Sequence, residues 1–374
     1  MAEYKLLKNC DIFTPLKLIK NGSILIKGEV IDRIGAVDES RIPSQTRVFS
    51  FKDKIVVPGF IDIHLHGGGG IDFLDASDDS IVKALRIHLQ NGTTAVLPSL
   101  MTASHGQVLK VLEKLIGIKN SYEEIPEIIG INLEGPYISK EKSGAQRTRY
   151  IRKPSLAEMR EYIQASKGHI KIMTVAPEAI GAGGFIRFLI EAGIIPSAGH
   201  TNASYDQTIK AVKSGVKLAT HLFNAMRGIA HREPGAAGAL LLSDDVYAEV
   251  VADGIHLHPS ILDLIVRAKP IEKIILVTDA TKFYGLRKGP SFTPQGRLYG
   301  SNTELGVALR NMVQFTGLPF PKVLRTVTLN PAKLLDVQKR KGSLKRGSDA
   351  DMVILDKELN VKGVFVKGKT IPAN

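Results

Sequence analysis

Apolar and polar positions follow two different patterns along the chain. Residues 1–54 hold short apolar segments separated by turns, and the pattern at 23–31 is typical of a hairpin. The same pattern returns near the other end of the chain, in 350–355 and 361–366. Because short strands joined by turns are typical of small β units, we expect the two ends, 1–54 and 342–374, to pair into one β-sandwich domain.

Between these ends, apolar segments alternate with amphipathic ones. The amphipathic segments are expected to be helices, as at 80–90 and 321–335, where apolar residues recur at helical spacing. The apolar segments are expected to be buried strands, and they cover 55–61, 93–99, 127–133, 170–175, 194–198, 216–219, 246–251 and 274–277. Eight strands that alternate with helices are typical of a closed parallel barrel. We therefore predict an α/β fold, a (β/α)8 TIM-like barrel over 55–341 with the small β-sandwich beside it.

Composition narrows the class of protein. Apolar residues make up 44% of the 374 residues, which is enough for a large core, and the only cysteine is Cys10. A single thiol excludes an internal disulfide and is typical of a reducing compartment. The first ten residues lack the basic and apolar regions of a signal peptide, and no apolar segment is long enough to cross a bilayer. We expect a cytoplasmic protein with no membrane partner.

The formal net charge of +13 allows two interpretations. A nucleic-acid-binding protein would concentrate its basic residues or carry a recognition motif. Here lysine and arginine are spread along the chain, the densest groups are short, and no recognition-helix, zinc-finger or aromatic RNA-binding motif is present. We therefore expect no nucleic-acid partner. A basic surface would also help to collect an anionic substrate.

Metal-binding residue types stand at the ends of several expected strands. His64 and His66 follow the first strand, and side chains two positions apart on an extended chain point to the same side. Four further strands, the third, fifth, sixth and eighth, end at Glu134, His200, His221 and Asp279, respectively. Singly, each residue has a structural interpretation, such as a core histidine or a helix cap. The active sites of barrels lie at the C-terminal ends of the strands, so a shared rim favours a site for zinc or a similar divalent ion.

Such a set would also support hydrolysis. A bound zinc ion lowers the pKa of a coordinated water to about 7 in favourable sites. A further carboxylate nearby can take the proton and pass it to a leaving group. Asp279 is the last residue of the set along the chain, and we predict this role for it.

Longer motifs extend over nearly the whole chain. They are Pro58-Gly59-Phe60-Ile61-Asp62, Leu133-Glu134-Gly135-Pro136-Tyr137, Ser197-Ala198-Gly199-His200-Thr201, Thr220-His221-Leu222-Phe223-Asn224-Ala225-Met226, His231-Arg232-Glu233-Pro234-Gly235, Asp253-Gly254-Ile255-His256, Val277-Thr278-Asp279-Ala280 and Gly342-Ser343-Leu344-Lys345-Arg346-Gly347. Together they resemble the amidohydrolase superfamily and, within it, the family of N-acetylglucosamine-6-phosphate deacetylases. The resemblance implies hydrolysis of the N-acetyl group of a small phosphosugar, N-acetylglucosamine 6-phosphate, to glucosamine 6-phosphate and acetate.

The resemblance also implies roles for the residues at the rim. Asp279 corresponds to the catalytic acid and base. The implied metal ligands are a main set and a second pair that only some members have: Glu134, His200 and His221, then His64 and His66. The implied cofactor is one or two divalent ions per subunit, zinc first, with iron, cobalt or manganese as alternatives.

A substrate-binding set follows from the same resemblance. Arg232 would bind the phosphate, because a guanidinium can donate two parallel hydrogen bonds. The alternative is a surface arginine paired with Glu233. Members of the family are commonly homodimers whose phosphate site borrows from the neighbouring subunit, so a homodimer is implied. The other implied substrate-binding residues are Ala145, Gln146, Asn224, Ala225, Asp253, Gly254, Ile255, His256, Leu298, Tyr299 and Gly300.

Two departures from the family pattern concern the strength and pH dependence of the contact with the carbonyl, and selectivity for the sugar. Gln146 stands where many relatives have a histidine that contacts the scissile carbonyl. A glutamine amide can still donate a hydrogen bond to the developing oxyanion, but it carries no positive charge. The segment between Asp279 and Gly300 is shorter than the usual lid. Leu298 and Tyr299 are still expected to cover the substrate, while the sugar epimer stays open.

Three alternative functions are weighed against this one. The substrate could be the galactosamine epimer. A second alternative is an amidohydrolase acting on a cyclic amide or an aminated base, which commonly uses a modified lysine near the end of strand four. This chain has no lysine in 174–178, and Glu134 can take the bridging place. The third is a non-catalytic scaffold, which would be expected to have lost ligands or the base, and none is missing here.

Overall fold

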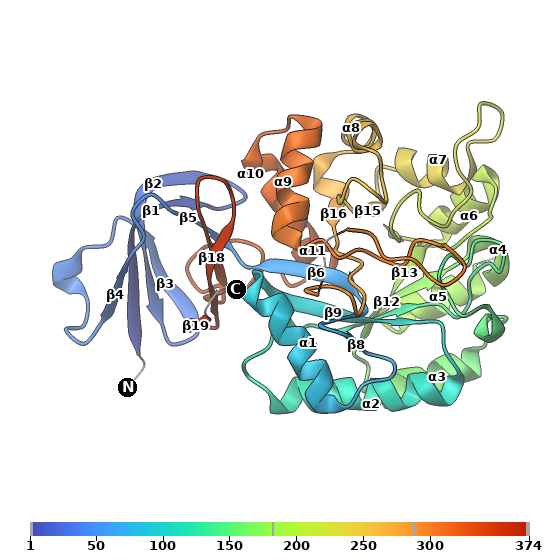
Figure 1. The fold of residues 1–374 in the computed structure, drawn as a ribbon, viewed down its shortest axis with the longest axis horizontal. Coiled ribbons are helices and arrows are strands. Elements are labelled where there is room, and N and C mark those ends of the chain that lie inside the picture. The colour runs from blue at the N-terminus through green and yellow to red at the C-terminus, as the bar shows by residue number, and fades with distance from the viewer. Residues whose placement is uncertain (1–2, 182, 287–288, 372–374) are drawn as a thin grey trace.

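The computed structural model describes residues 3–181, 183–286 and 289–371. Two parts are visible in Figure 1: a small sheet built from both ends of the chain, and a barrel surrounded by helices. None of the helices within the described ranges combines the length and apolar character needed to cross a membrane.

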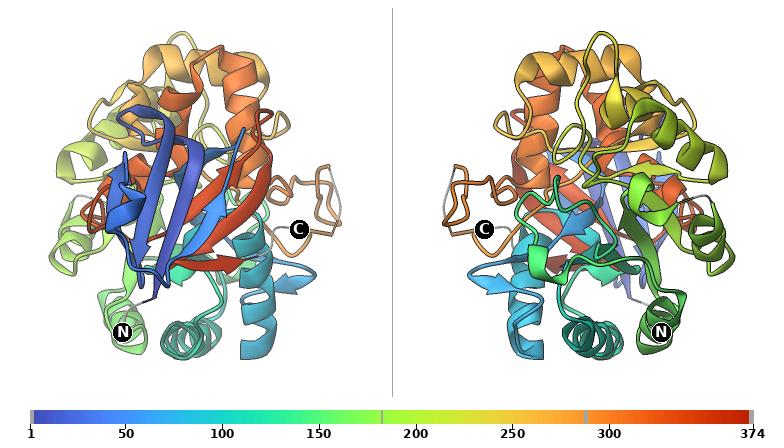
Figure 2. Two further views of the ribbon diagram at one scale, coloured as in Figure 1. Left: turned by 90° about the vertical axis from the view of Figure 1, so that its left-hand side faces the viewer. Right: turned by 90° about the vertical axis from the view of Figure 1, so that its right-hand side faces the viewer.

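Strands from both ends of the chain form one hydrogen-bonded sheet. In the described residues its order is β19-β18-β17-β5-β1-β2-β3, and β4 also pairs with β1. The strands are β1 Tyr4–Phe13, β2 Leu18–Lys27, β3 Val30–Gly35, β4 Arg47–Ser50, β5 Ile55–Pro58, β17 Met352–Leu355, β18 Val361–Val366 and β19 Lys369–Ile371. Their buried faces share one core that includes Leu7, Ile24 and Phe365. Figure 2 shows the strands of the two ends side by side, so the predicted pairing of the ends is confirmed.

The prediction of one strand at 55–61 is wrong, because this region contains parts of two separate strands. β5 pairs antiparallel with β17 in the terminal sheet, whereas β6 (Phe60–Leu65) belongs to the barrel. Gly59 lies between them, and a Cβ there would come within 2.1 Å of Thr94 Oγ1. Both strands are apolar, so the sequence pattern did not separate them. This pairing favours a domain boundary at Gly59, and the predicted division into 1–54, 55–341 and 342–374 stays a prediction.

Parallel strands form the barrel. In ring order they are β6 Phe60–Leu65, β9 Thr93–Met101, β11 Ile131–Glu134, β12 Ile170–Val175, β13 Ile195–Ala198, β14 Leu218–Ala219, β15 Tyr247–Val250 and β16 Ile274–Leu276. The short strand β10 (Glu127–Ile128) also pairs with β9. The ring closes just beyond β16, where Asp279 N donates to His64 O at 2.9 Å and a parallel bridge joins Leu65 to Ala280. The predicted barrel is therefore confirmed, and a hairpin of β7 (Gly67–Gly68) and β8 (Ile71–Asp72) stands at its rim.

Helices cover the outside of the barrel (Figure 1). They are α1 Asp78–Gln90, α2 His105–Ser121, α3 Leu156–Ala165, α4 Pro177–Ile180, α5 Gly184–Glu191, α6 Tyr205–Ser214, α7 Gly235–Leu242, α8 Pro259–Ala268, α9 Leu305–Thr316, α10 Phe320–Leu324 and α11 Leu329–Leu334. Short 3-10 turns lie at Glu39–Arg41, Thr148–Tyr150, Ile271–Lys273 and Arg325–Val327. The expected helix at 321–335 is wrong as one piece. Pro331 has no N–H for a helical hydrogen bond, and the helix starts again at Leu329 with Pro331 in its first turn.

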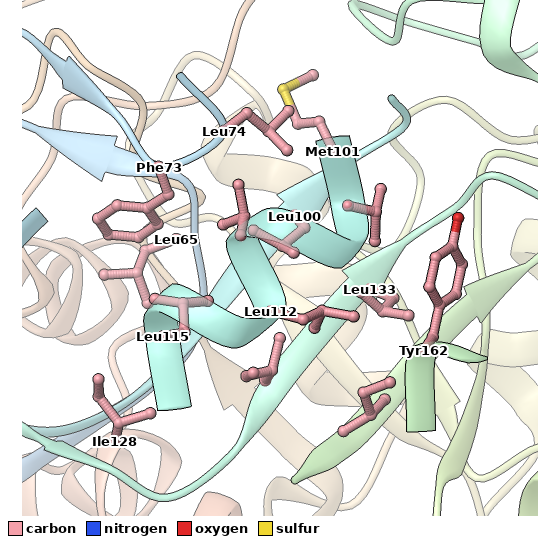
Figure 3. Packing of buried hydrophobic residues seen from close by; sticks show 14 of the residues in the cluster. Leu65, Phe73, Leu74, Leu100, Met101, Leu112, Leu115, Ile128, Leu133 and Tyr162 are labelled. Atoms are coloured by element: carbon pink, nitrogen blue, oxygen red, sulfur yellow. The ribbon is translucent and has the colours of Figure 1, made fainter. Parts of the chain in front are cut away.

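Apolar packing holds α2 against two neighbouring strands of the barrel, β9 and β11. Leu112 and Leu115 of α2 are fully buried against Leu100 of β9 and Leu133 of β11 (Figure 3). Protein interiors are packed as densely as organic crystals, so this contact fixes where the two strands end. The end of β11, which carries Glu134, therefore rests on a close-packed core.

Candidate active site

The five predicted metal ligands and the predicted catalytic residue, Asp279, meet at the C-terminal rim of the barrel. They form two groups, and within each group the possible ligand atoms lie within 4.8 Å of one another. The groups are His64, His66 and Asp279, and Glu134, His200 and His221. The strands that carry them span most of the ring, so only barrel closure brings them together.

The second group has the spacing of metal ligands. Glu134 Oε1 lies 2.9 Å from His200 Nε2 and 3.0 Å from His221 Nε2, and the two nitrogens are 3.2 Å apart. Ligand atoms about 2.0–2.1 Å from a tetrahedral zinc ion would lie about 3.3 Å apart. His200 Nδ1 donates to Lys142 O at 2.9 Å, which leaves Nε2 free to bind the ion. These residues fit a divalent ion.

The first group has similar spacing. His64 Nε2 is 3.2 Å from His66 Nε2, and Asp279 Oδ1 is 3.3 Å from His66 Nε2. Both rings are oriented through Nδ1, which donates to Glu249 Oε2 at 2.8 Å in His64 and to Ser99 O at 3.0 Å in His66. Glu134 Oε2 is 3.4 Å from His66 Nε2, so this carboxylate stands between the two groups.

The backbone turns sharply where three of the barrel segments deliver a functional side chain. His200, His221 and Asp279 have φ values of 45°, 29° and 48°. Residues other than glycine are uncommon in this left-handed region, and they concentrate at functional sites. Ending a strand in this way redirects the next side chain, and no residue pattern in the sequence indicates it.

The surroundings of Glu134 and Asp279 favour the charged carboxylates. Burial alone would raise the pKa of Glu134, but the charge and hydrogen bonds of His200 and His221 hold it well below its usual range. Burial likewise opposes ionisation of Asp279, yet the hydrogen bond with His66 and the charge of His64 lower its pKa to about 2. Asp279 is therefore a carboxylate at neutral pH and can accept a proton.

Both groups border one cavity of about 220 Å³. Many residues of the predicted substrate-binding set line this cavity: Ala145, Gln146, Asn224, Ala225, His256, Leu298, Tyr299 and Gly300. Gln146 Oε1 accepts from Thr102 N at 2.7 Å, and its Nε2 donates to Glu134. An amide nitrogen carries two hydrogens, so one N–H of Gln146 remains for a substrate.

Four predicted substrate-binding residues do not line this cavity in the described chain: Arg232, Asp253, Gly254 and Ile255. Asp253 acts through a neighbour, because its Oδ2 accepts from His256 Nδ1 at 2.7 Å. Arg232 is exposed. The predicted alternative partner of Arg232, Glu233, instead accepts from the backbone N–H groups of Tyr205 and Gly235.

Sequence reasoning missed several residues of the site. Arg297 lines the cavity, and its Nη1 donates to Gly144 O at 2.9 Å and to Ser143 Oγ at 3.2 Å. Nothing in the sequence distinguishes it from a surface arginine. Glu249 lies behind the site, and the available signal was an acidic residue within the apolar strand β15. Met101, Gly144 and Thr281 also line the cavity.

The comparison that decides the family is the match of the amidohydrolase family model to residues 55–371. The chain belongs to the amidohydrolase family. It is also similar to the N-acetylglucosamine-6-phosphate deacetylase of Bacillus subtilis (strain 168), with 35% identity over 98% of this chain and 97% of that protein.

Solved structures agree with this assignment. A mutant N-acetyl-D-glucosamine-6-phosphate deacetylase from Mycobacterium smegmatis, in complex with N-acetyl-D-glucosamine-6-phosphate, has a TM-score of 0.90 and 32% identity. The similarity covers 98% of this chain and 99% of that one. N-acetylglucosamine-6-phosphate deacetylase from Pasteurella multocida has a TM-score of 0.91 and 29% identity, over 99% of this chain and 100% of that one.

Proposed function

We propose that this protein hydrolyses the N-acetyl group of N-acetylglucosamine 6-phosphate and releases glucosamine 6-phosphate and acetate. The observation that carries the proposal is that Glu134, His200 and His221 meet Asp279 at one cavity. Proteins named for this reaction are 35% identical to the chain over 98% of its length. The relatives favour this reaction over the cyclic-amide alternative.

The residues present would hold one or two divalent ions, with zinc as the first candidate and iron, cobalt or manganese as alternatives. Glu134 would be shared between the group of His200 and His221 and the group of His64 and His66. When bound, such an ion polarises a carbonyl oxygen and makes a nucleophile from water near neutral pH.

Asp279 would act as base and then as acid. It is ionised at neutral pH, so a carboxylate oxygen is available to accept the proton of the attacking water. As the new C–O bond forms and the amide C–N bond breaks, Asp279 returns this proton to the departing nitrogen. The products are the free amine and acetate.

Gln146 and the lid would position the acetyl group. The free N–H of Gln146 would donate to the carbonyl oxygen as negative charge develops on it. Leu298 and Tyr299 line the same cavity and would cover the sugar.

The phosphate would be bound at the side of the cavity lined by Asn224, Ala225 and His256. Arg232 is exposed and stands outside the cavity of its own chain, as expected if it serves the phosphate site of a neighbouring subunit. We therefore propose a homodimer. We also propose a cytoplasmic location, because the single cysteine, Cys10, fits a reducing compartment.

Acetate release from a panel of sugars tests the function. We expect zinc-loaded protein to act on N-acetylglucosamine 6-phosphate, and far less on the unphosphorylated sugar. The galactosamine epimer with the same phosphate distinguishes the remaining alternative. Release of no acetate from any of the phosphorylated sugars by metal-loaded protein would contradict the proposal.

A further inference from the structure

We propose that Glu249 is a positioning residue that holds the two candidate ion sites in place. Without its side chain, we expect the chain to lose the ion held by His64 and His66. This inference rests on the metal site of the proposed function. Glu249 lies on β15, is fully buried, and is not among the residues that line the cavity.

One oxygen of Glu249 contacts a ligand residue from each group. Oε2 accepts from His64 Nδ1 at 2.8 Å and from the backbone N–H of His221 at 3.1 Å. His64 belongs to the first group and His221 to the second. A single carboxylate therefore supports both ion sites from behind.

The contact with His64 determines which ring nitrogen can bind metal. A neutral imidazole carries one proton, and the hydrogen bond to Glu249 holds that proton on Nδ1. The lone pair of Nε2 then points to the first group, 3.2 Å from His66 Nε2. If the carboxylate were absent, His64 would be free to rotate or to change its tautomer.

The hydrogen bond to the His221 backbone matters because the His221 ring has no orienting hydrogen bond through Nδ1. His200 is oriented through its Nδ1, which donates to Lys142 O, whereas His221 Nδ1 has no hydrogen-bond partner among the described residues. The direction of the His221 ring therefore depends on its backbone, which has a φ of 29°. Glu249 secures this turn twice, since its backbone carbonyl also accepts from Leu222 N at 2.9 Å.

If the role of Glu249 were purely structural, a buried carboxylate at this position would cost folding free energy. Its neighbours on the strand, Ala248 and Val250, are apolar and buried. Glu249 Oε1 is buried without a hydrogen-bond partner in the described part of the chain. Burying a charge is costly unless positive charge or hydrogen bonds compensate it. A metal-bound imidazole provides such compensation.

The test is the number of zinc ions per chain, measured by mass spectrometry after removal of metal and titration with zinc. Wild type is expected to bind two ions. Glu249→Leu removes both contacts and should bind one, as should His64→Ala. The double variant His64→Ala/Glu249→Leu should bind its remaining ion more weakly than His64→Ala does, because the contact with the His221 backbone is lost as well.

Two further variants separate loss of the Glu249 contacts from a general defect in folding. Glu249→Gln keeps an acceptor oxygen and the shape of the side chain, so it should fold even if Glu249→Leu does not. Its affinity for the ion held by His64 and His66 should fall about 10–100-fold, the usual effect of changing a side chain that hydrogen-bonds to a metal ligand. Val250→Ala creates a core defect on the same strand and should keep both ions.

Three results would overturn the inference. The first is wild-type zinc content and affinity in Glu249→Leu, or unchanged affinity in Glu249→Gln if the leucine variant is unfolded. The second is an equal loss of zinc in Val250→Ala. The third is that wild-type protein, titrated to saturation, binds fewer than two zinc ions per chain. None of these decides whether acetate is released, so failure of this inference and failure of the proposed function are separate outcomes.

Discussion

The chemistry of this site depends on which nitrogen of each histidine faces the cavity. His64, His66 and His200 each donate from Nδ1 to a carboxylate or to a backbone carbonyl. Their Nε2 atoms then converge on the two ligand groups. Each ring is therefore in position before an ion arrives, which reduces the cost of ordering ligands on binding.

Asp279→Asn should keep the fold and the metal but lose most turnover. The amide has the shape of the carboxylate but cannot accept and return a proton, and groups with this role contribute about 10²–10⁴-fold to rate. Steady-state kcat with zinc-loaded protein checks the prediction, and zinc content serves as its control. A variant with near-normal kcat would refute the assignment of Asp279.

Among the elements, the lid between β16 and α9 connects the two sides of the cavity. Arg297 binds Gly144 O and Ser143 Oγ in the segment after β11. On the same lid, Tyr299 donates to Asp72 Oδ2 at 3.2 Å. Two side chains therefore attach the lid to two parts of the rim, the segment after β11 and the hairpin that contains β8.

Arg297→Ala should raise KM for the phosphosugar with a smaller change in kcat. The substitution removes both hydrogen bonds to the segment after β11, while Asp279 and the ligands stay in place. A loss of about 1.4 kcal/mol in lid closure corresponds to a KM increase of about tenfold. Arg149 is an exposed neighbour that does not line this cavity, so Arg149→Ala is the matched control. Equal KM values for the two variants would show that the lid contact is unimportant.

For the molecule as a whole, a buried ionic network joins the barrel to the terminal sheet. Lys341 Nζ lies 2.9 Å from Glu127 Oε2 next to β9 and 2.8 Å from Asp349 Oδ2, and it also contacts Asp351 beside β17. The Lys341 side chain is only 3% exposed. Removing one partner of such a network leaves buried charge uncompensated, so the network favours one arrangement of the two parts.

Glu127→Gln should weaken the acid dependence of stability. Burial opposes ionisation of Glu127, but the hydrogen bond from Arg340 and the charge of Lys341 lower its pKa from 4.5 to about 2. A depressed pKa in the folded state contributes stability above the unfolded pKa, and this contribution is lost as the pH falls from 4.5 towards 2. Melting temperatures measured in steps across this range should fall more steeply for wild type than for the variant. Parallel curves would contradict the prediction.

Arg232→Ala tests whether Arg232 binds the phosphate of the substrate. Loss of a charge-assisted pair should cost about 1.5–3 kcal/mol for the phosphorylated substrate and little for the unphosphorylated one. Equal KM changes for both substrates would mean that Arg232 does not contact the phosphate.

Mixing this variant with Asp279→Asn tests the shared site directly. A mixed dimer would hold one complete site, with Asp279 from one chain and Arg232 from the other. Random exchange of subunits should then restore up to about a quarter of wild-type activity. Activity no higher than that of the separate variants would contradict a site shared between subunits.

Local patterns in the sequence were enough to predict the barrel and the residues that meet at its rim. Periods of apolar residues indicated the strands and helices, and the rule that parallel strands present their C-terminal ends at one rim brought Glu134, His200 and Asp279 together. The same patterns gave wrong predictions at 55–61 and at 321–335. In each region two adjacent apolar elements were predicted as a single element. Periodicity reports burial, and it does not report which sheet or helix an apolar segment joins.

Tertiary structure alone decided how these residues are supported. Glu249 and His64 are 185 positions apart, and Arg297 and Gly144 are 153 apart. Contacts across such distances exist only after the barrel has closed and the lid has folded over it, and no neighbouring residue records them. The left-handed backbone at His221 is also invisible in the sequence, because a histidine there has no local sign of its conformation. Ligand identity is therefore a property of single residues, whereas their orientation is a property of the closed ring.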